Sequence, residues 1–240
     1  MMRIKKENGL FIAEYSVTGQ NHILKGQANQ DAMLSGCLNE NLMYVALADG
    51  VSSAQYAEQG SLYAVKTIDK LVKEISLGSL DICDRKELQN KIVHYWKEQI
   101  QCNWNEYATT LNFIIYVNSF LIVGQIGDGL ICLNIDGINS FITTAEDFYT
   151  METAALSEMV YRKDFYLNIY PVKSTFSAVM MTDGIGKEIP EDSRIPLEKY
   201  LEHLSRDSVK FEKEIRLWIN SLGNKNGDDK SIIYIRREEL

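Results

Sequence analysis

Residues 42–50 read LMYVALADG, an apolar run that stops at an Asp-Gly pair, and this arrangement decides the fold. It occurs again at residues 120–129 (FLIVGQIGDG) and 176–184 (FSAVMMTDG), and residues 226–235 (NGDDKSIIYI) place two aspartates before a further apolar run. Short apolar runs bounded by such turn residues predict β-strands. A strand that ends in Asp-Gly brings a carboxylate to the sheet edge, and the glycine allows backbone or ligand to approach closely. Several such ends on one edge would form a site for a hard cation.

The alternative interpretation of an Asp-Gly pair is a type I′ hairpin turn without chemistry. It fits residues 128–129 and 136–137, because a second apolar run follows each pair closely. Asp49 and Asp183 differ, since neither is followed by an alternating partner strand. We therefore predict hairpin turns at 128–129 and 136–137, and strand-end ligands at Asp49 and Asp183.

Length and composition are those of one soluble globular domain that covers residues 1–240. Hydrophobic residues make up 45% and charged residues 24% of the chain. The net charge is −8 and the pI is about 5.0, which argues against nucleic acid as a partner. The four cysteines show no zinc-binding spacing, and no run is long enough to be a signal peptide or to span a membrane. We expect a cytoplasmic protein without a membrane partner.

The order of predicted elements favours an α+β layered sandwich over alternating βαβ units. Apolar spacing predicts a helix with Ser52 or Ser53 as its N-cap, and a second helix that begins at the capping-box-like Asp84-x-x-Glu87. Residues 108–143 are rich in β-branched and aromatic residues and predict antiparallel strands. The other predicted elements are strands at 11–17, 42–48, 175–182 and 231–237, and a helix at 211–223 that Gly223 closes.

A further acidic motif precedes the second strand, in residues 19–34 (GQNHILKGQANQDAML). In chain order the sequence therefore contains NQDA, ADG, VGQIGDG, TDG and DDKS. This order resembles the metal-dependent Ser/Thr protein phosphatases of type 2C (PPM), and in particular a bacterial branch with a GxxH…G…QDA first motif. The resemblance extends from about Gly19 to Ile235. It implies a four-layer α-β-β-α sandwich, in which helices flank two antiparallel sheets and a binuclear metal site lies at one sheet edge.

The resemblance also implies a set of metal-ligating residues. They are Asp31, Asp49, Gly50 through its carbonyl, Asp183 and Asp228, with Asp128 in the position that helps some bacterial members to hold a third, weaker metal. Aspartate oxygens without a convergent His/Cys set favour Mg²⁺ or Mn²⁺ over zinc. Two such ions can activate a bridging water for attack on phosphorus, so no nucleophilic side chain is required.

The chain departs from the family pattern at two places. Many relatives carry a phosphate-binding arginine five residues before the first aspartate, where this chain has Gly26; His22 or Lys25 is expected to take that role. Many also continue the ADG motif with Gly-Gly-His, whereas this chain reads ADGVSSAQYA. Protonation of the leaving group would then fall to His22, to a metal-bound water, or to no group at all.

The resemblance implies a phosphatase that acts on phosphoserine or phosphothreonine by means of a metal-activated bridging water. Its substrate would be a phosphoprotein that a bacterial Ser/Thr kinase modifies, and we expect a monomer with two metal ions. The missing arginine and histidine leave an alternative, a weakly active or silent member that binds phosphorylated partners. A phosphatase for small molecules is a third possibility.

Overall fold

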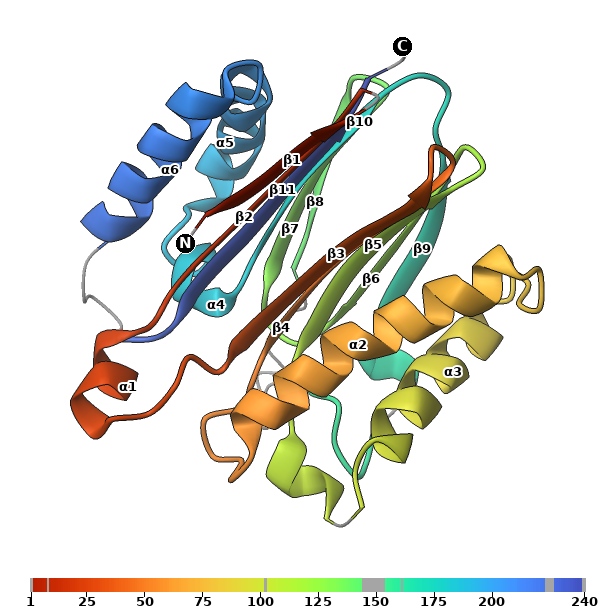
Figure 1. Ribbon diagram of the computed structural model, residues 1–240, viewed down its shortest axis with the longest axis vertical. Helices are drawn as coiled ribbons and strands as arrows, with labels where there is room; N and C mark the ends of the chain where they lie inside the picture. Colours follow the sequence, from red (N-terminus) through yellow and green to blue (C-terminus); the bar gives the residue numbers. More distant parts are fainter. Residues whose placement is uncertain are drawn as a thin grey trace. The chain divides into compact units, whose positions relative to one another are not determined.

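The structure is a computed structural model that describes residues 2–7, 9–101, 103–143, 154–160, 162–222 and 227–238. The chain divides into two compact units (Figure 1). Unit 1 comprises Met1–Asn29, Gly129–Thr143 and Val172–Leu240, and unit 2 comprises Gln30–Asp128 and Thr144–Pro171. Residues 146–153 (EDFYTMET), to which the sequence assigns no role, lie outside the described residues. The assignment of residues 1–240 to a single domain stays a prediction.

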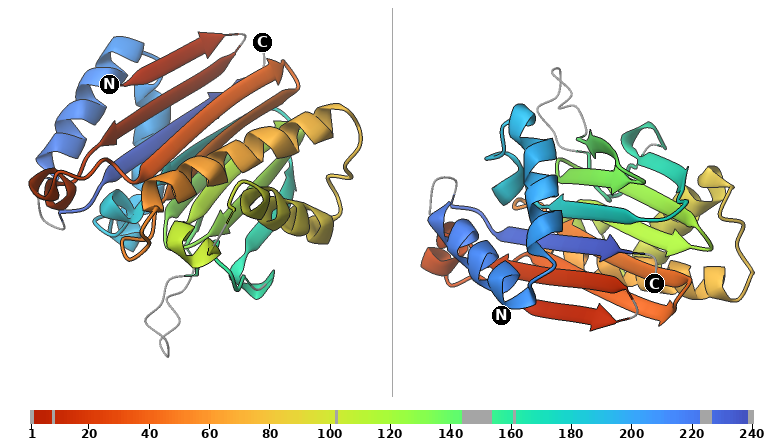
Figure 2. Two further views of the ribbon diagram at one scale, coloured as in Figure 1. Left: turned by 60° about the horizontal axis from the view of Figure 1, so that its bottom comes forward. Right: turned by 90° about the horizontal axis from the view of Figure 1, so that it is seen from above.

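Unit 1 is a six-stranded antiparallel sheet with the strand order β1-β2-β11-β10-β7-β8. Helices α5 and α6 cover one of its faces (Figure 2), where the rings of Phe11 and Phe211 meet edge to face with centroids 5.2 Å apart. Its strands are β1 (Arg3–Glu7), β2 (Leu10–Val17), β7 (Leu130–Ile135), β8 (Ile138–Ile142), β10 (Phe176–Met181) and β11 (Lys230–Arg237). Its helices are α1 (Gln20–Lys25), α4 (Asp183–Gly186), α5 (Glu191–Leu204) and α6 (Ser208–Ser221).

Unit 2 is a five-stranded antiparallel sheet with the order β3-β4-β5-β6-β9. Helix α2 lies along one face and α3 packs beside it (Figure 1), over a core that includes the fully buried Trp96 and Ile115. Its strands are β3 (Asp31–Asn39), β4 (Leu42–Asp49), β5 (Leu111–Val117), β6 (Phe120–Ile126) and β9 (Tyr166–Pro171). Its helices are α2 (Ala57–Ser76), α3 (Arg85–Glu98) and the 3₁₀ turns η1 (Trp104–Tyr107) and η2 (Arg162–Asp164).

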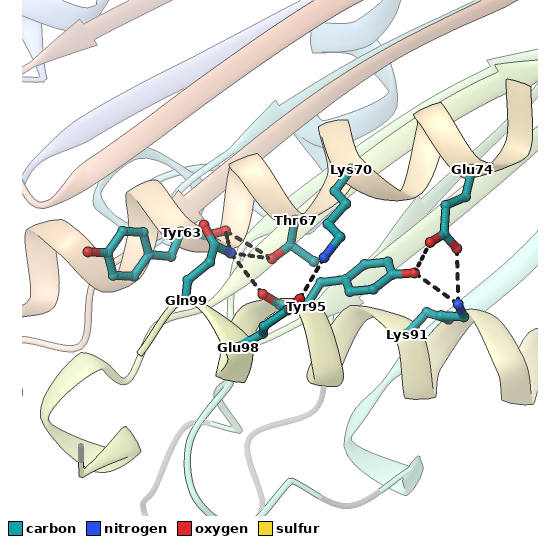
Figure 3. Close-up of polar contacts among 8 residues, drawn as sticks. All are labelled: Tyr63, Thr67, Lys70, Glu74, Lys91, Tyr95, Glu98 and Gln99. Atoms are coloured by element: carbon teal, nitrogen blue, oxygen red, sulfur yellow. Dashed lines mark hydrogen bonds and ion pairs between the residues drawn. The ribbon is translucent and has the colours of Figure 1, made fainter. Parts of the chain in front are cut away.

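Hydrogen bonds and ion pairs between side chains hold α3 against α2 (Figure 3). The Tyr95 hydroxyl donates to Glu74, whose other oxygen accepts from the Lys91 ammonium at 3.1 Å. Lys70 reaches Glu98 at 2.6 Å and lies 4.1 Å from the centroid of the Tyr95 ring. The Tyr95 hydrogen bond lowers the pKa of Glu74, and the ion pairs with lysine act in the same direction. Helix α2, which follows the first Asp-Gly pair, is thereby held in place along its length.

The two helix starts predicted in this region have different outcomes. The capping box is confirmed, because the Asp84 side chain accepts from the Glu87 N–H at 2.9 Å. The N-cap at Ser52 or Ser53 is wrong, since α2 begins at Ala57. Backbone contacts fix that start: the Tyr56 N–H donates to the carbonyl of Glu106 at 2.7 Å.

The two predicted hairpin turns also have different outcomes. At 136–137 the turn is confirmed, with Ile135 paired to Ile138 and positive φ at both turn residues (51° and 86°). At 128–129 it is wrong, because β6 pairs with β5 and β9 in unit 2, whereas β7 pairs with β10 and β8 in unit 1. Asp128 therefore lies on the connection between the two units and not in a hairpin.

The carboxylate of Asp136 has a structural role. It accepts the backbone N–H groups of Lys173, Ser174 and Thr175 at 2.8, 2.8 and 3.1 Å. These hydrogen bonds, that from Lys173 foremost, lower the pKa of Asp136 to about 2.

Among the residues that the structure describes, no helix is long and apolar enough to cross a membrane.

Candidate metal centre

In unit 2 the predicted ligands Asp31 and Asp49 face each other across two strands. They are register partners in the antiparallel pair β3–β4, so that their side chains lie on the same side of the sheet. Like charges directly opposite each other destabilise a sheet. This Asp31–Asp49 pair is therefore an arrangement that a cation would stabilise.

Two threonines directly before β5, Thr109 and Thr110, hold the backbone of Asp49. The Asp49 N–H donates to Thr110 Oγ1 at 2.9 Å, and its carbonyl accepts both the Thr110 N–H at 2.8 Å and the Thr109 hydroxyl at 2.9 Å. Both threonines are buried. A side chain on Gly127, which has a φ of 106°, would come within 2.5 Å of Thr110, so the loop that carries Asp128 packs against the same threonine. These contacts within unit 2 thus fix both the N–H group and the carbonyl group of Asp49.

Gly50 is required by close packing against the first turn of α2. Its N–H donates to the carbonyl of Gln30 at 3.1 Å, and a Cβ at this position would lie 2.5 Å from the carbonyl oxygen of Ala57. The glycine that follows the aspartate is therefore explained by backbone packing. Its predicted carbonyl contact with a metal stays a prediction.

In unit 1 the ends of β10 and β11 bring Asp183 and Asp228 together. The Thr182 N–H donates to the carbonyl of Ser231, and the Ser231 N–H donates to Thr182 Oγ1, both at 3.1 Å. Burial raises the pKa of Asp228, and the negative charge of Asp183 raises it further. These two carboxylates form the Asp183–Asp228 cluster, which a bound cation would also stabilise.

The oxygens of Asp183 have different surroundings. Oδ2 accepts from the Lys187 ammonium at 2.8 Å. Oδ1 is buried and accepts no hydrogen bond from the part of the chain that the structure describes. A buried carboxylate oxygen without a donor is costly unless a cation binds it. Oxygen ligands of this kind fit Mg²⁺ or Mn²⁺.

His22 is buried in unit 1 and bound to Asp229. Its Nδ1 lies 2.9 Å from Asp229 Oδ2, while Oδ1 accepts the Gly19 N–H at 2.6 Å. Because an ionised carboxylate can only accept, Nδ1 carries a proton in this contact, and the ring orientation is fixed. Asp229 is only 1% exposed and so anchors the start of α1 and its histidine. Lys25, at the other end of α1, is exposed.

The predicted site residues, both metal ligands and phosphate-binding residues, are distributed over the two units. Unit 2 carries Asp31, Asp49, Gly50 and Asp128, whereas unit 1 carries His22, Lys25, Asp183 and Asp228. Within the described residues of either unit, no group of three or more His, Cys, Asp and Glu side chains gathers closely enough to hold a metal ion. The structure brings together one acidic pair in each unit, and a shared centre of all these residues stays a prediction.

Sequence reasoning missed the residues that position the ligands. Thr109 and Thr110 belong to an unremarkable strand start, and Lys187 follows Asp183 by one helical turn. Asp229 was placed in the last motif without a role. The available signals were the adjacent aspartates at 228–229 and the Gly-x-x-His motif that ends at His22. The two partners, His22 and Asp229, lie 207 residues apart in the sequence.

Solved structures with the same fold include two that contain magnesium or manganese. RsbX in complex with magnesium is 13% identical, with a TM-score of 0.66 over 99% of this chain and 100% of that one. The catalytic domain of the serine/threonine phosphatase PstP with two manganese ions is 18% identical, with a TM-score of 0.65 over 94% of this chain and 97% of that one. PstP/Ppp of Mycobacterium tuberculosis is 17% identical, with a TM-score of 0.63 over 95% and 99%. These matches confirm the predicted α+β class of two antiparallel sheets with flanking helices.

The family follows from the sequence itself. The model of the family described as protein phosphatase 2C matches residues 18–222, so the chain belongs to the protein phosphatase 2C family. The resemblance stated from the acidic motifs is thereby confirmed. No curated protein matches the sequence.

Proposed function

We propose that this protein is a metal-dependent phosphatase that hydrolyses phosphoserine or phosphothreonine in proteins. The observation that supports this most is the pairing of like-charged carboxylates at strand ends, Asp31 with Asp49 and Asp183 with Asp228. Neither arrangement benefits folding, because facing or buried carboxylates repel each other. Both fit the binding of hard divalent ions.

The roles of the residues follow from these surroundings. Asp31, Asp49, Asp183, Asp228 and the Gly50 carbonyl would hold two Mg²⁺ or Mn²⁺ ions, with Asp128 available to a third. Bound in this way, the ions would supply Lewis acidity toward the phosphate and a water of lowered pKa. Thr109 and Thr110 keep Asp49 in place, and Asp229 keeps His22 in place.

The test is a phosphatase assay on phosphoserine and phosphothreonine peptides. We expect turnover with Mn²⁺, loss of turnover when EDTA removes the metal, and recovery when Mn²⁺ is added back. A thermal shift on addition of Mn²⁺ provides a readout that does not depend on activity. Turnover that persists in EDTA would refute the proposal.

The second candidate is a family member that binds phosphorylated partners without hydrolysing them. It is favoured by Gly26 at the position of the usual arginine and by the absence of a histidine after Asp49-Gly50. This candidate predicts that calorimetry detects binding of Mn²⁺ and of a phosphopeptide, whereas the peptide assay detects no released phosphate.

His22 is proposed to protonate the leaving group in its doubly protonated form: Asp229 accepts from Nδ1–H and fixes the ring, and the Nε2–H proton passes to the leaving oxygen. We expect His22→Gln to slow hydrolysis of a phosphoserine peptide about 10²-fold. Hydrolysis of 4-nitrophenyl phosphate should change little, because a good leaving group needs no proton. If His22→Gln instead raised KM to a similar extent for both substrates, His22 would be a phosphate-binding residue.

A further inference from the structure

Lys187 is bound to Asp183 through both its backbone and its side chain. It directly follows α4, and its N–H donates to the Asp183 carbonyl at 3.1 Å. Its ammonium lies 2.8 Å from Asp183 Oδ2, on the same face of the helical turn. The side chain of Lys187 is 50% exposed, whereas that of Asp183 is only 17% exposed. The ammonium can therefore leave the carboxylate without losing hydration.

The carboxylate that Lys187 binds is one that needs a cation. Asp183 and Asp228 lie close enough for their charges to repel each other. Lys187 reduces this repulsion, but a divalent metal that binds Asp183 would do so more strongly. Because a carboxylate that neutralises a metal attracts an ammonium less, Lys187 and the metal compete for Asp183.

Two other basic side chains contact the same region, and both are buried. His22 is held by Asp229, and the Lys230 ammonium donates to the backbone carbonyl of Asp228 at 2.9 Å. Lys230 is only 5% exposed. Lys187 is thus the most exposed of these three positive charges, and its side chain is long enough to reach a substrate group.

We propose that Lys187 is a positively charged residue of the site with two successive partners. It neutralises Asp183 until a divalent metal displaces it, and it then binds the phosphate group of the substrate. This inference rests on the proposed function. It supplies a phosphate-binding cation for a chain that has Gly26 in place of the usual arginine. It also makes phosphate binding dependent on prior metal binding.

The test compares Lys187→Met with Lys213→Met, which removes the same charge from the exposed surface of α6 in the same unit. Calorimetry measures the binding of Mn²⁺ to each metal-free protein, and then of inorganic phosphate to each Mn²⁺-loaded protein. We expect Lys187→Met to bind Mn²⁺ about twofold to fivefold more tightly than wild type, as the loss of a half-exposed ion pair allows. We expect it to bind phosphate about fivefold to tenfold more weakly. Lys213→Met should match wild type in both.

The results separate this inference from the function on which it rests. If the wild-type protein binds no Mn²⁺, the proposed function and the role of Lys187 both fail. If wild type binds Mn²⁺ but Lys187→Met binds it no more tightly, or binds phosphate equally well, only the role of Lys187 is overturned.

Discussion

Replacing Asp49 by asparagine is expected to lower Mn²⁺-dependent hydrolysis of a phosphopeptide by at least about 10³-fold, since a metal ion contributes several kcal/mol to such a reaction. Asparagine has the shape of aspartate, so the backbone of residue 49 still accepts from the Thr109 hydroxyl and still donates its N–H to Thr110 Oγ1. The variant should also lose the thermal stabilisation that Mn²⁺ gives to the wild-type protein.

The same substitution should stabilise the protein when metal is absent. Asp49 faces Asp31 across β3 and β4, and neutralising one carboxylate removes their repulsion. We expect a gain of about 0.5 kcal/mol in the free energy of unfolding in EDTA, as for a cross-strand pair of like charges. Opposite effects on activity and on stability are characteristic of a ligand for a metal, and not of a residue that holds the fold together.

Asp69→Asn is the matched control within the same unit. Asp69 lies on α2, where it accepts from the Tyr44 hydroxyl at 2.5 Å and from Lys73 at 2.6 Å. Although burial opposes it, these hydrogen bonds lower the pKa of Asp69. We expect Asp69→Asn to keep its activity and to lose stability. If Asp49→Asn instead lost stability in EDTA and bound Mn²⁺ normally, Asp49 would be a structural residue.

Replacing Gly184 by alanine is expected to cost about 2–3 kcal/mol of stability, the upper part of the range for forced overpacking. A Cβ at this position would lie 1.9 Å from the carbonyl oxygen of Asp229, so one of the two backbones must move. Movement of Asp229 would break its hydrogen bonds to Gly19 and His22. The variant should therefore lose Mn²⁺ binding even at temperatures at which it stays folded.

Gly186→Ala provides the comparison from the same short helix. There the nearest atom would be the side-chain Cβ of Leu130 at 3.0 Å, which can give way slightly. We expect a cost of about 1 kcal/mol or less, with Mn²⁺ binding retained. Chemical denaturation gives both stabilities, and calorimetry gives the affinities. A Gly184→Ala protein as stable as wild type would show that this close approach is not required.

Features that depend on neighbouring residues were predicted well from the sequence. The strand that ends at Asp49, the capping box at Asp84 and the turn at 136–137 are all confirmed. In each of them the residues that interact lie within a few positions along the chain. The ordered acidic motifs also identified the family correctly.

Features that depend on distant partners were predicted poorly. The apolar runs around Asp128 satisfy the rule for a hairpin, but β6 pairs with β9 and β7 pairs with β10. The start of α2 depends on a backbone contact with Glu106, which no local N-cap signal reports. In the same way, the role of Asp229 becomes visible only once β11 lies beside β2.

The place of β11 in its sheet has a consequence for biosynthesis. This strand lies between β2 and β10, yet it is made after every other strand of unit 1. Until β11 has been synthesised, β2 and β10 lack the neighbour that both require, and their open edges invite pairing with other chains. The hydrogen-bond partner of His22, Asp229, is likewise synthesised 207 residues later. A nascent chain therefore cannot form the His22–Asp229 bond or the Asp183–Asp228 cluster before β11 is made. The site residues of unit 1 reach their positions only when the sheet is complete.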